Sequence, residues 1–80
     1  MAKSQNIVHQ YYKKQLEDGL RILVKVNPYL FTGTEITLSP QNKTHIRELT
    51  FDEHIFKDLE ADGFEPCNPL EFNLYLSGLA

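Results

Sequence analysis

The chain of 80 residues has one cysteine, no tryptophan and no long hydrophobic run. A single cysteine excludes an intramolecular disulfide and is typical of proteins from reducing compartments. No apolar run approaches the length of a membrane span or of a signal-peptide core. We therefore expect a cytoplasmic protein with no membrane partner.

Sequence motifs of catalysis are also missing. The chain contains no Cys-x-x-Cys, no Gly-x-Ser-x-Gly and no glycine-rich phosphate loop. His54 and Asp58 have a spacing at which two helical side chains can share a metal, but no further cysteine or histidine completes a site. Cys67 is expected to be a small apolar filler. We therefore predict a protein that is not an enzyme and that holds no cofactor or metal.

The size and composition indicate one small folded domain over residues 1–80, with residues 1–5 disordered. Hydrophobic residues make up 41% of the chain, and nine residues are aromatic, which is enough for a core. A chain of this length lies near the lower limit for folding without disulfides or metals. Burial of additional surface in a homodimer would therefore be favourable.

The charged residues are divided by sign along the chain. Residues 1–47 carry seven basic and three acidic residues, a net charge of +4, whereas residues 48–80 carry one basic and eight acidic residues, a net charge of −7. The two sums give the overall net charge of −3. Such an asymmetry bears on partners and self-association rather than on fold.

Residues 5–18 fit an amphipathic helix. Val8, Tyr11, Tyr12 and Leu16 share one face of such a helix. The alternative is a hairpin that turns at Asp18-Gly19, because Asp-Gly between apolar segments is a strong turn signal. Alternation of apolar and polar residues is poor before Asp18, so we prefer the helix.

Three later segments have the pattern of strands. Residues 20–26 alternate between apolar and polar side chains and end at Asn27-Pro28. Residues 35–39 alternate again. A turn over residues 39–43 then leads to a partner strand over residues 44–49.

A helix is expected after the third strand. Thr50 and Glu53 have the spacing of a capping box, with Thr50 as the N-cap residue. An apolar stripe follows, and Gly63 is expected to end the helix.

The last segment has two competing patterns. Asn68-Pro69-Leu70-Glu71 is typical of a helix start, with an N-cap asparagine and a proline at the first helical position. Residues 70–77, however, alternate between apolar and polar side chains without exception. We favour a fourth strand over residues 70–77.

The expected element order is therefore α-β-β-β-α-β. It corresponds to the α+β class, as a two-layer sandwich with an antiparallel sheet of three to four strands and two helices on one face. Four apolar residues are expected to point from the sheet to the helices: Ile22, Val24, Ile36 and Leu38.

The opposite face of this sheet would then be open to solvent. It would carry basic side chains and two leucines, and a lysine from the adjacent turn would add to them. This candidate interaction face consists of Arg21, Leu23, Lys25, Lys43, His45, Arg47 and Leu49.

Apolar residues rimmed by polar groups often mark an interface. We therefore hypothesise a small non-enzymatic interaction or regulatory module that acts through protein–protein contacts, with a protein partner or a second copy of itself in a homodimer. The alternative hypothesis is binding of nucleic acid or another polyanion by the basic face. A sequence pI of about 5.5 disfavours the alternative.

Overall fold

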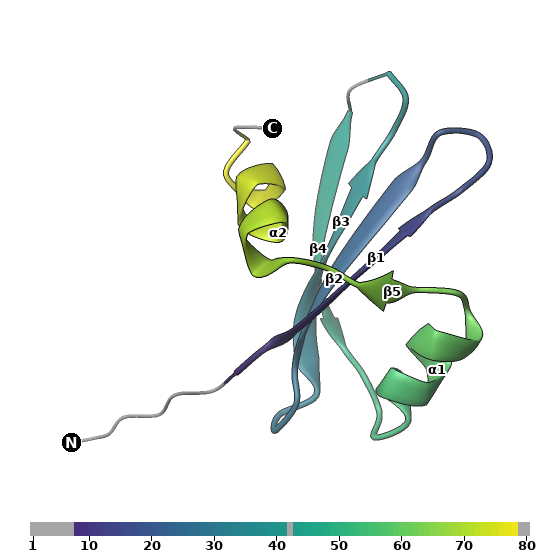
Figure 1. Cartoon of the computed structure of the whole chain (residues 1–80). Helices are drawn as coiled ribbons and strands as arrows, with labels where there is room; N and C mark the ends of the chain where they lie inside the picture. The colour runs from purple at the N-terminus through teal and green to yellow at the C-terminus, as the bar shows by residue number, and fades with distance from the viewer. Residues whose placement is uncertain (1–7, 42, 79–80) are drawn as a thin grey trace.

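A computed structural model describes residues 8–41 and 43–78 of the chain (Figure 1). Residues 1–5, expected to be disordered, and the beginning of the expected first helix lie outside the described residues. Within the described residues, five strands and two helices follow one another in the order β-β-β-β-α-β-α. Their bounds are β1 Gln10–Gln15, β2 Arg21–Asn27, β3 Thr32–Leu38, β4 Thr44–Thr50, α1 Ile55–Ala61, β5 Glu65–Pro66 and α2 Pro69–Leu76.

All strands belong to one antiparallel sheet with the order β4-β3-β2-β1-β5. The expected α+β class and the antiparallel pairing are confirmed, as are the strands predicted within β2, β3 and β4. The sheet has five strands rather than the expected three to four. β2 lies at its centre, with two strands on each side.

The two helices lie on opposite faces of the sheet, not on one face as expected. Phe72 of α2 packs with Leu23 and Ile36 on one side, which we call the α2 face. On the other side, the α1 face, Ile55 and Leu59 of α1 pack against Val24 and Val26 of β2. Successive strand residues point to opposite faces, so β2 supplies side chains to both cores.

The expected helix over residues 5–18 is wrong in the described part, where β1 forms instead. β1 and β2 are joined by the turn containing Asp18-Gly19, which was the alternative reading. Tyr11 packs in the core of the α2 face and Tyr12 in that of the α1 face. Because β1 is half-buried on both sides, it lacks the alternation that identifies a strand with one exposed face.

The expected helix after β4 exists, but its start differs. Thr50 is the last residue of β4 rather than an N-cap, and α1 begins at Ile55 without a side-chain cap. The end of α1 agrees with the expectation. Gly63 has a φ of +87°, and the backbone N–H of Phe64 donates to the carbonyl oxygen of Leu59. These are the features of a Schellman motif.

The expected fourth strand over residues 70–77 is wrong, because α2 occupies this segment. The Oδ1 atom of Asn68 accepts a hydrogen bond from the backbone N–H of Leu70 at 2.7 Å, with proline at the first turn. Phe72 is fully buried, whereas Leu70, Leu74 and Leu76 are exposed. The alternating leucines therefore do not define a buried strand face, and the capping signal at Asn68 was the informative one.

We expect Phe72→Ala to lower the free energy of unfolding by about 3–5 kcal/mol, because it removes a buried ring from the core of the α2 face. Leu70→Ala lies in the same helix but removes a side chain that is 67% exposed, so a change within about 0.5 kcal/mol is expected. Urea unfolding of both variants measures the difference. Equal losses would contradict the described orientation of α2. Phe72→Leu replaces Phe72→Ala if the alanine variant does not fold.

Candidate functional site

The sheet register divides the predicted interaction face between both sides of the sheet. Leu23 pairs with Ile36, and Val24 pairs with Glu35. Residues that pair directly share a face, so the expectation that Val24 and Ile36 point to the same side is wrong. Among the candidate residues, the α2 face holds Arg21, Leu23 and Lys25, the α1 face holds His45, Arg47 and Leu49, and Lys43 lies in the turn between β3 and β4.

The two leucines of the predicted face do not form an exposed apolar patch. Leu23 is 1% exposed because α2 covers it with Phe72. Leu49 is partly buried on the opposite face. Sheet-to-sheet docking through these two side chains is therefore not available to this fold.

β4 is the most exposed of the four longer strands, β1 to β4. It forms one end of the strand order, and six of its seven residues are exposed. All seven pair with β3 on one side. Within the described residues, no strand pairs with its other side. β4 therefore presents a regular row of backbone N–H and C=O groups to solvent.

Side chains on both faces hold β4 to β3. On the α1 face, Arg47 donates from Nε and Nη2 to Oε1 of Glu35, at 3.0 and 2.8 Å. On the α2 face, the Thr34 hydroxyl donates to the Glu48 carboxylate at 3.2 Å. Ile46 lies on the α2 face between Thr44 and Glu48 of the same strand and remains 48% exposed. These contacts hold β4 to β3, while the outer edge of β4 remains open.

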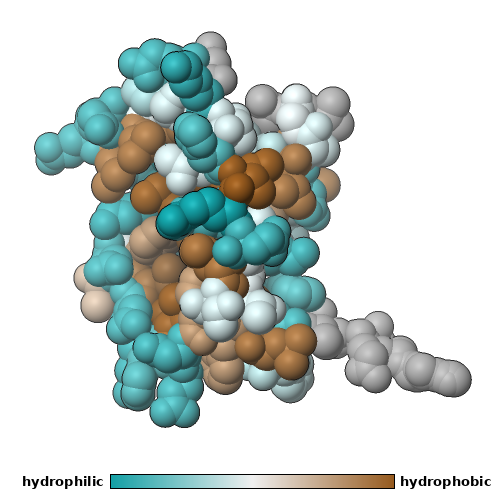
Figure 2. Space-filling view, turned by 180° about the vertical axis from the view of Figure 1, so that it is seen from behind, coloured by the Kyte–Doolittle hydropathy of each residue, from teal (hydrophilic) through white to brown (hydrophobic). Residues whose placement is uncertain are grey.

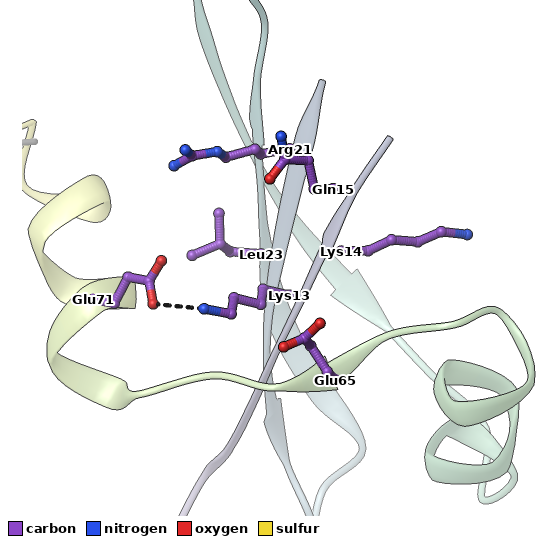
Figure 3. A pocket seen from close by; sticks show the side chains of 7 residues that line it. All are labelled: Lys13, Lys14, Gln15, Arg21, Leu23, Glu65 and Glu71. Atoms are coloured by element: carbon purple, nitrogen blue, oxygen red, sulfur yellow. Dashed lines mark hydrogen bonds and ion pairs between the residues drawn. The ribbon is translucent and has the colours of Figure 1, made fainter. Parts of the chain in front are cut away.

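A hollow of about 270 Å³ lies between α2, β1 and β5 on the α2 face (Figure 3). In Figure 3, Lys13 points to Glu71 of α2, Leu23 lies between them and Arg21, and Lys14 points away. The Nζ atom of Lys13 lies 3.2 Å from Oε1 of Glu71. Because Glu65 also lines this hollow, its cations and carboxylates largely offset one another.

A second hollow of about 380 Å³ lies beyond Arg21, towards the turns of the two hairpins. Its lining combines two cations, Arg21 and Lys43, with the side chains of Ser39, Thr44 and Tyr75. Arg21 donates from Nη1 to the Tyr75 hydroxyl at 2.6 Å. Arg21 and Lys43 were candidates from sequence, whereas Tyr75 was assigned to a strand and was missed. Only the N-cap signal at Asn68 would have placed it on a helix.

The acidic second part of the chain surrounds the basic sheet. Residues 48–80, with their net charge of −7, supply α1, β5 and α2. Lys13 pairs with Glu71 of α2, and the Lys14 ammonium lies 5.8 Å from the centroid of the Phe64 ring. Some of the opposite charges of the two parts are therefore paired within one molecule and are not available to a partner.

Among the described residues, three ionisable groups have a raised pKa. Burial raises the pKa of the Cys67 thiol above its usual 9.0, and the Glu71 carboxylate raises it further. The hydrogen bond to Glu71 raises the pKa of Lys13, and burial raises that of Tyr12. Cys67 itself is 8% exposed and packs in the core of the α2 face. A buried, protonated thiol agrees with its expected role as a filler rather than with a nucleophile.

His54 immediately precedes α1 and lies 3.8 Å from the Glu53 carboxylate. Within residues 8–41 and 43–78, no three side chains of the histidine, cysteine, aspartate and glutamate types come together as a metal site would require. No helix in the same part of the chain is long and apolar enough to cross a membrane.

No family model, curated protein or solved structure matches this chain. The surfaces described above therefore have to be interpreted from their own chemistry.

We expect the free energy of unfolding to fall as the pH rises above about 9, because the folded chain binds protons more tightly than the unfolded chain. The unfolded thiol of Cys67 loses its proton near its usual pKa of 9.0, while the folded thiol keeps it to a higher pH. The folded state then holds more protons, so stability decreases with pH in this window. Tyr12 and Lys13, with usual pKa values of 10.0 and 10.5, act in the same direction at higher pH.

Cys67→Ala should remove the first part of this decrease, between about pH 8.5 and 10, and leave the later part. Urea unfolding of both proteins across this range measures the slope of stability against pH rather than its absolute value. Equal slopes in the variant and the parent protein would contradict the assignment to the thiol.

Proposed function

We propose that this protein is a small non-enzymatic interaction module that self-associates through the open edge of β4. The observation that carries the proposal is the regular seven-residue β4, which has an unpaired outer edge within the described residues. An open edge of this kind accepts a further strand by backbone hydrogen bonds. The occupant that we propose is β4 of a second copy.

The two ends of the sheet differ in how they are protected. β5 has only two residues and includes Pro66, which cannot donate a backbone hydrogen bond. Short strands and prolines are common means of preventing edge pairing. β4 is long, contains no proline and shows no break in its pairing with β3. Its outer edge is therefore the one suited to pairing with another chain.

The exposed apolar side chains of β4 itself bear on edge pairing. The space-filling view from behind shows brown hydrophobic side chains among teal hydrophilic ones (Figure 2). Among the β4 side chains, Ile46 is the exposed large hydrophobic one. It would be the central apolar contact of an interface built mainly on the backbone.

A symmetric pair of antiparallel β4 strands restricts the possible registers. When a two-fold axis perpendicular to the sheet relates the strands, one residue must lie opposite its own copy. A centre at Arg47 or Glu48 would bring identical charges together, which destabilises a cross-strand pair. A centre at His45 would place Lys43 opposite Arg47. A centre at Leu49 would leave only three β4 residues paired.

A centre at Ile46 avoids these conflicts. It brings two isoleucines together and places Thr44 opposite Glu48 of the partner strand. The same combination already exists within one copy, where the Thr34 hydroxyl donates to Glu48 across β3 and β4. His45 would lie opposite Arg47, whose guanidinium is already neutralised by Glu35. This register therefore pairs the five residues 44–48 and is the one that we propose.

The hypothesis of polyanion binding by one basic face loses its geometric basis. Arg21 and Lys25 lie on the α2 face, whereas His45 and Arg47 lie on the α1 face. Arg47 is also paired with Glu35. A nucleic-acid backbone lying along either face would meet only part of the cations that the hypothesis combined.

Ile46→Lys should weaken self-association at least tenfold, because two ammonium groups would meet at the centre of the paired strands. Leu30→Lys is the matched control, since it adds the same charge at a side chain that is 67% exposed and lies outside β4. Sedimentation velocity over a range of protein concentrations measures the dimer dissociation constant, and urea unfolding verifies that both variants fold. A parent protein that stays monomeric at high micromolar concentration, or equal effects of both variants, would contradict the proposal.

His45→Glu should tighten the dimer about fivefold, because the Arg47 Nη1 atom, which does not bind Glu35, can donate to the new carboxylate, and each of two such pairs contributes about 0.5 kcal/mol. If the pairing is centred at Arg47 instead, residue 45 lies opposite Leu49 of the partner strand, and no gain in affinity is expected. Sedimentation at low salt measures the change, and high salt should reduce it. An unchanged dissociation constant at low salt would refute the register centred at Ile46.

A further inference from the structure

We propose that the second hollow, between the two hairpin turns and the end of α2, binds a phosphate monoester. Three segments distant in sequence meet there: the turn between β1 and β2, the turn between β3 and β4, and the last turn of α2. Figure 1 shows both hairpin turns at the same end of the sheet as the C-terminal end of α2. The hollow of about 380 Å³ is large enough for a small ligand.

The charge of the lining favours a dianion. Arg21 and Lys43 bring two positive charges, and no carboxylate lines this hollow. In the neighbouring hollow, by contrast, Glu65 and Glu71 offset the cations. Asp18 is the nearest acidic residue in sequence, and its Oδ1 atom already accepts a hydrogen bond from the backbone N–H of Leu20 at 3.1 Å. The two ionisable side chains that line the second hollow and carry charge at neutral pH are therefore both positive.

The hydroxyl groups of the lining have protons available for an anion. The Tyr75 oxygen accepts a hydrogen bond from Arg21, so its own proton is free to donate. The Ser39 oxygen accepts from the backbone N–H of Lys43 at 3.2 Å, which leaves its proton free in the same way. Thr44 supplies a third hydroxyl. Phosphate oxygens accept several hydrogen bonds, and this set of donors matches them.

Contacts between the two turns maintain the shape of the hollow. Gly19 has a φ of +89°, and a Cβ atom at this position would lie 3.4 Å from the Pro40 side chain. The Ser39 backbone N–H donates to the Lys43 carbonyl oxygen at 2.9 Å, which closes the second turn. The two turns therefore lie close together at Gly19 and Pro40, and the backbones of Ser39 and Lys43 are joined at the base of the second turn.

Binding of inorganic phosphate tests the proposal directly. Titration of the protein at low ionic strength and about pH 7.5, where a phosphate monoester is mainly a dianion, should shift the amide NMR signals of Gly19, Ser39 and Lys43. Chloride at matched ionic strength should not shift them. Arg21→Gln should weaken phosphate binding at least tenfold, and Tyr75→Phe and Lys43→Gln several-fold.

Lys25→Gln is the matched control, because Lys25 lies on the same face of β2 as Arg21 but outside the hollow. It removes the same charge and should leave phosphate binding within about twofold. Glucose 6-phosphate and a short phosphoserine peptide then represent the two sources of a monoester, a metabolite and a phosphorylated protein. Tighter binding of either one supports the site and identifies its source. Shifts that chloride reproduces, or equal losses in Arg21→Gln and Lys25→Gln, would overturn the proposal.

Discussion

The register between β2 and β3 is the constraint on which the rest of the structure depends. Leu23 and Val24 are consecutive, and both are almost fully buried, at 1% and 3% exposure. Consecutive strand residues point to opposite faces, so each face of the sheet needs a cover. α2 covers Leu23 and α1 covers Val24. The same register separates the basic residues of β2 from those of β4.

The placement of the helices also determines where charge remains available. Acidic segments flank a basic sheet on both faces, and the Lys13–Glu71 pair joins the two parts on the α2 face. Opposite charges within one small domain reduce its long-range field in solution. Lys43, in the turn after β3, lines a hollow whose lining includes no carboxylate, so it keeps more of its effect. The electrostatics therefore favour local binding sites over docking of a whole face.

The sequence predicted those elements that have one buried face or a strong end signal. β2 and β3 were found by alternation, β4 was found as the partner strand after a predicted turn, and the end of α1 was found at Gly63. β1 was missed because Tyr11 and Tyr12 enter different cores, which removes the periodicity. α2 was missed because its exposed leucines imitate a strand. Single-sequence patterns do not contain strand register, so the predicted interaction face combined residues of two faces.

In a domain this small, helices cover both faces of the sheet, so binding sites are expected at its edges and turns, which form its perimeter. Each core includes side chains from one helix. A face without its helix would expose Leu23, and a chain of 80 residues depends on that apolar burial for its stability. The perimeter of the sheet does not have to be covered by a helix in this way. β4 can offer its backbone while its inner side stays paired with β3, and the hairpin turns can hold polar donors without weakening either core. Both proposed sites lie at this perimeter, where binding a strand or an anion leaves the two cores unchanged.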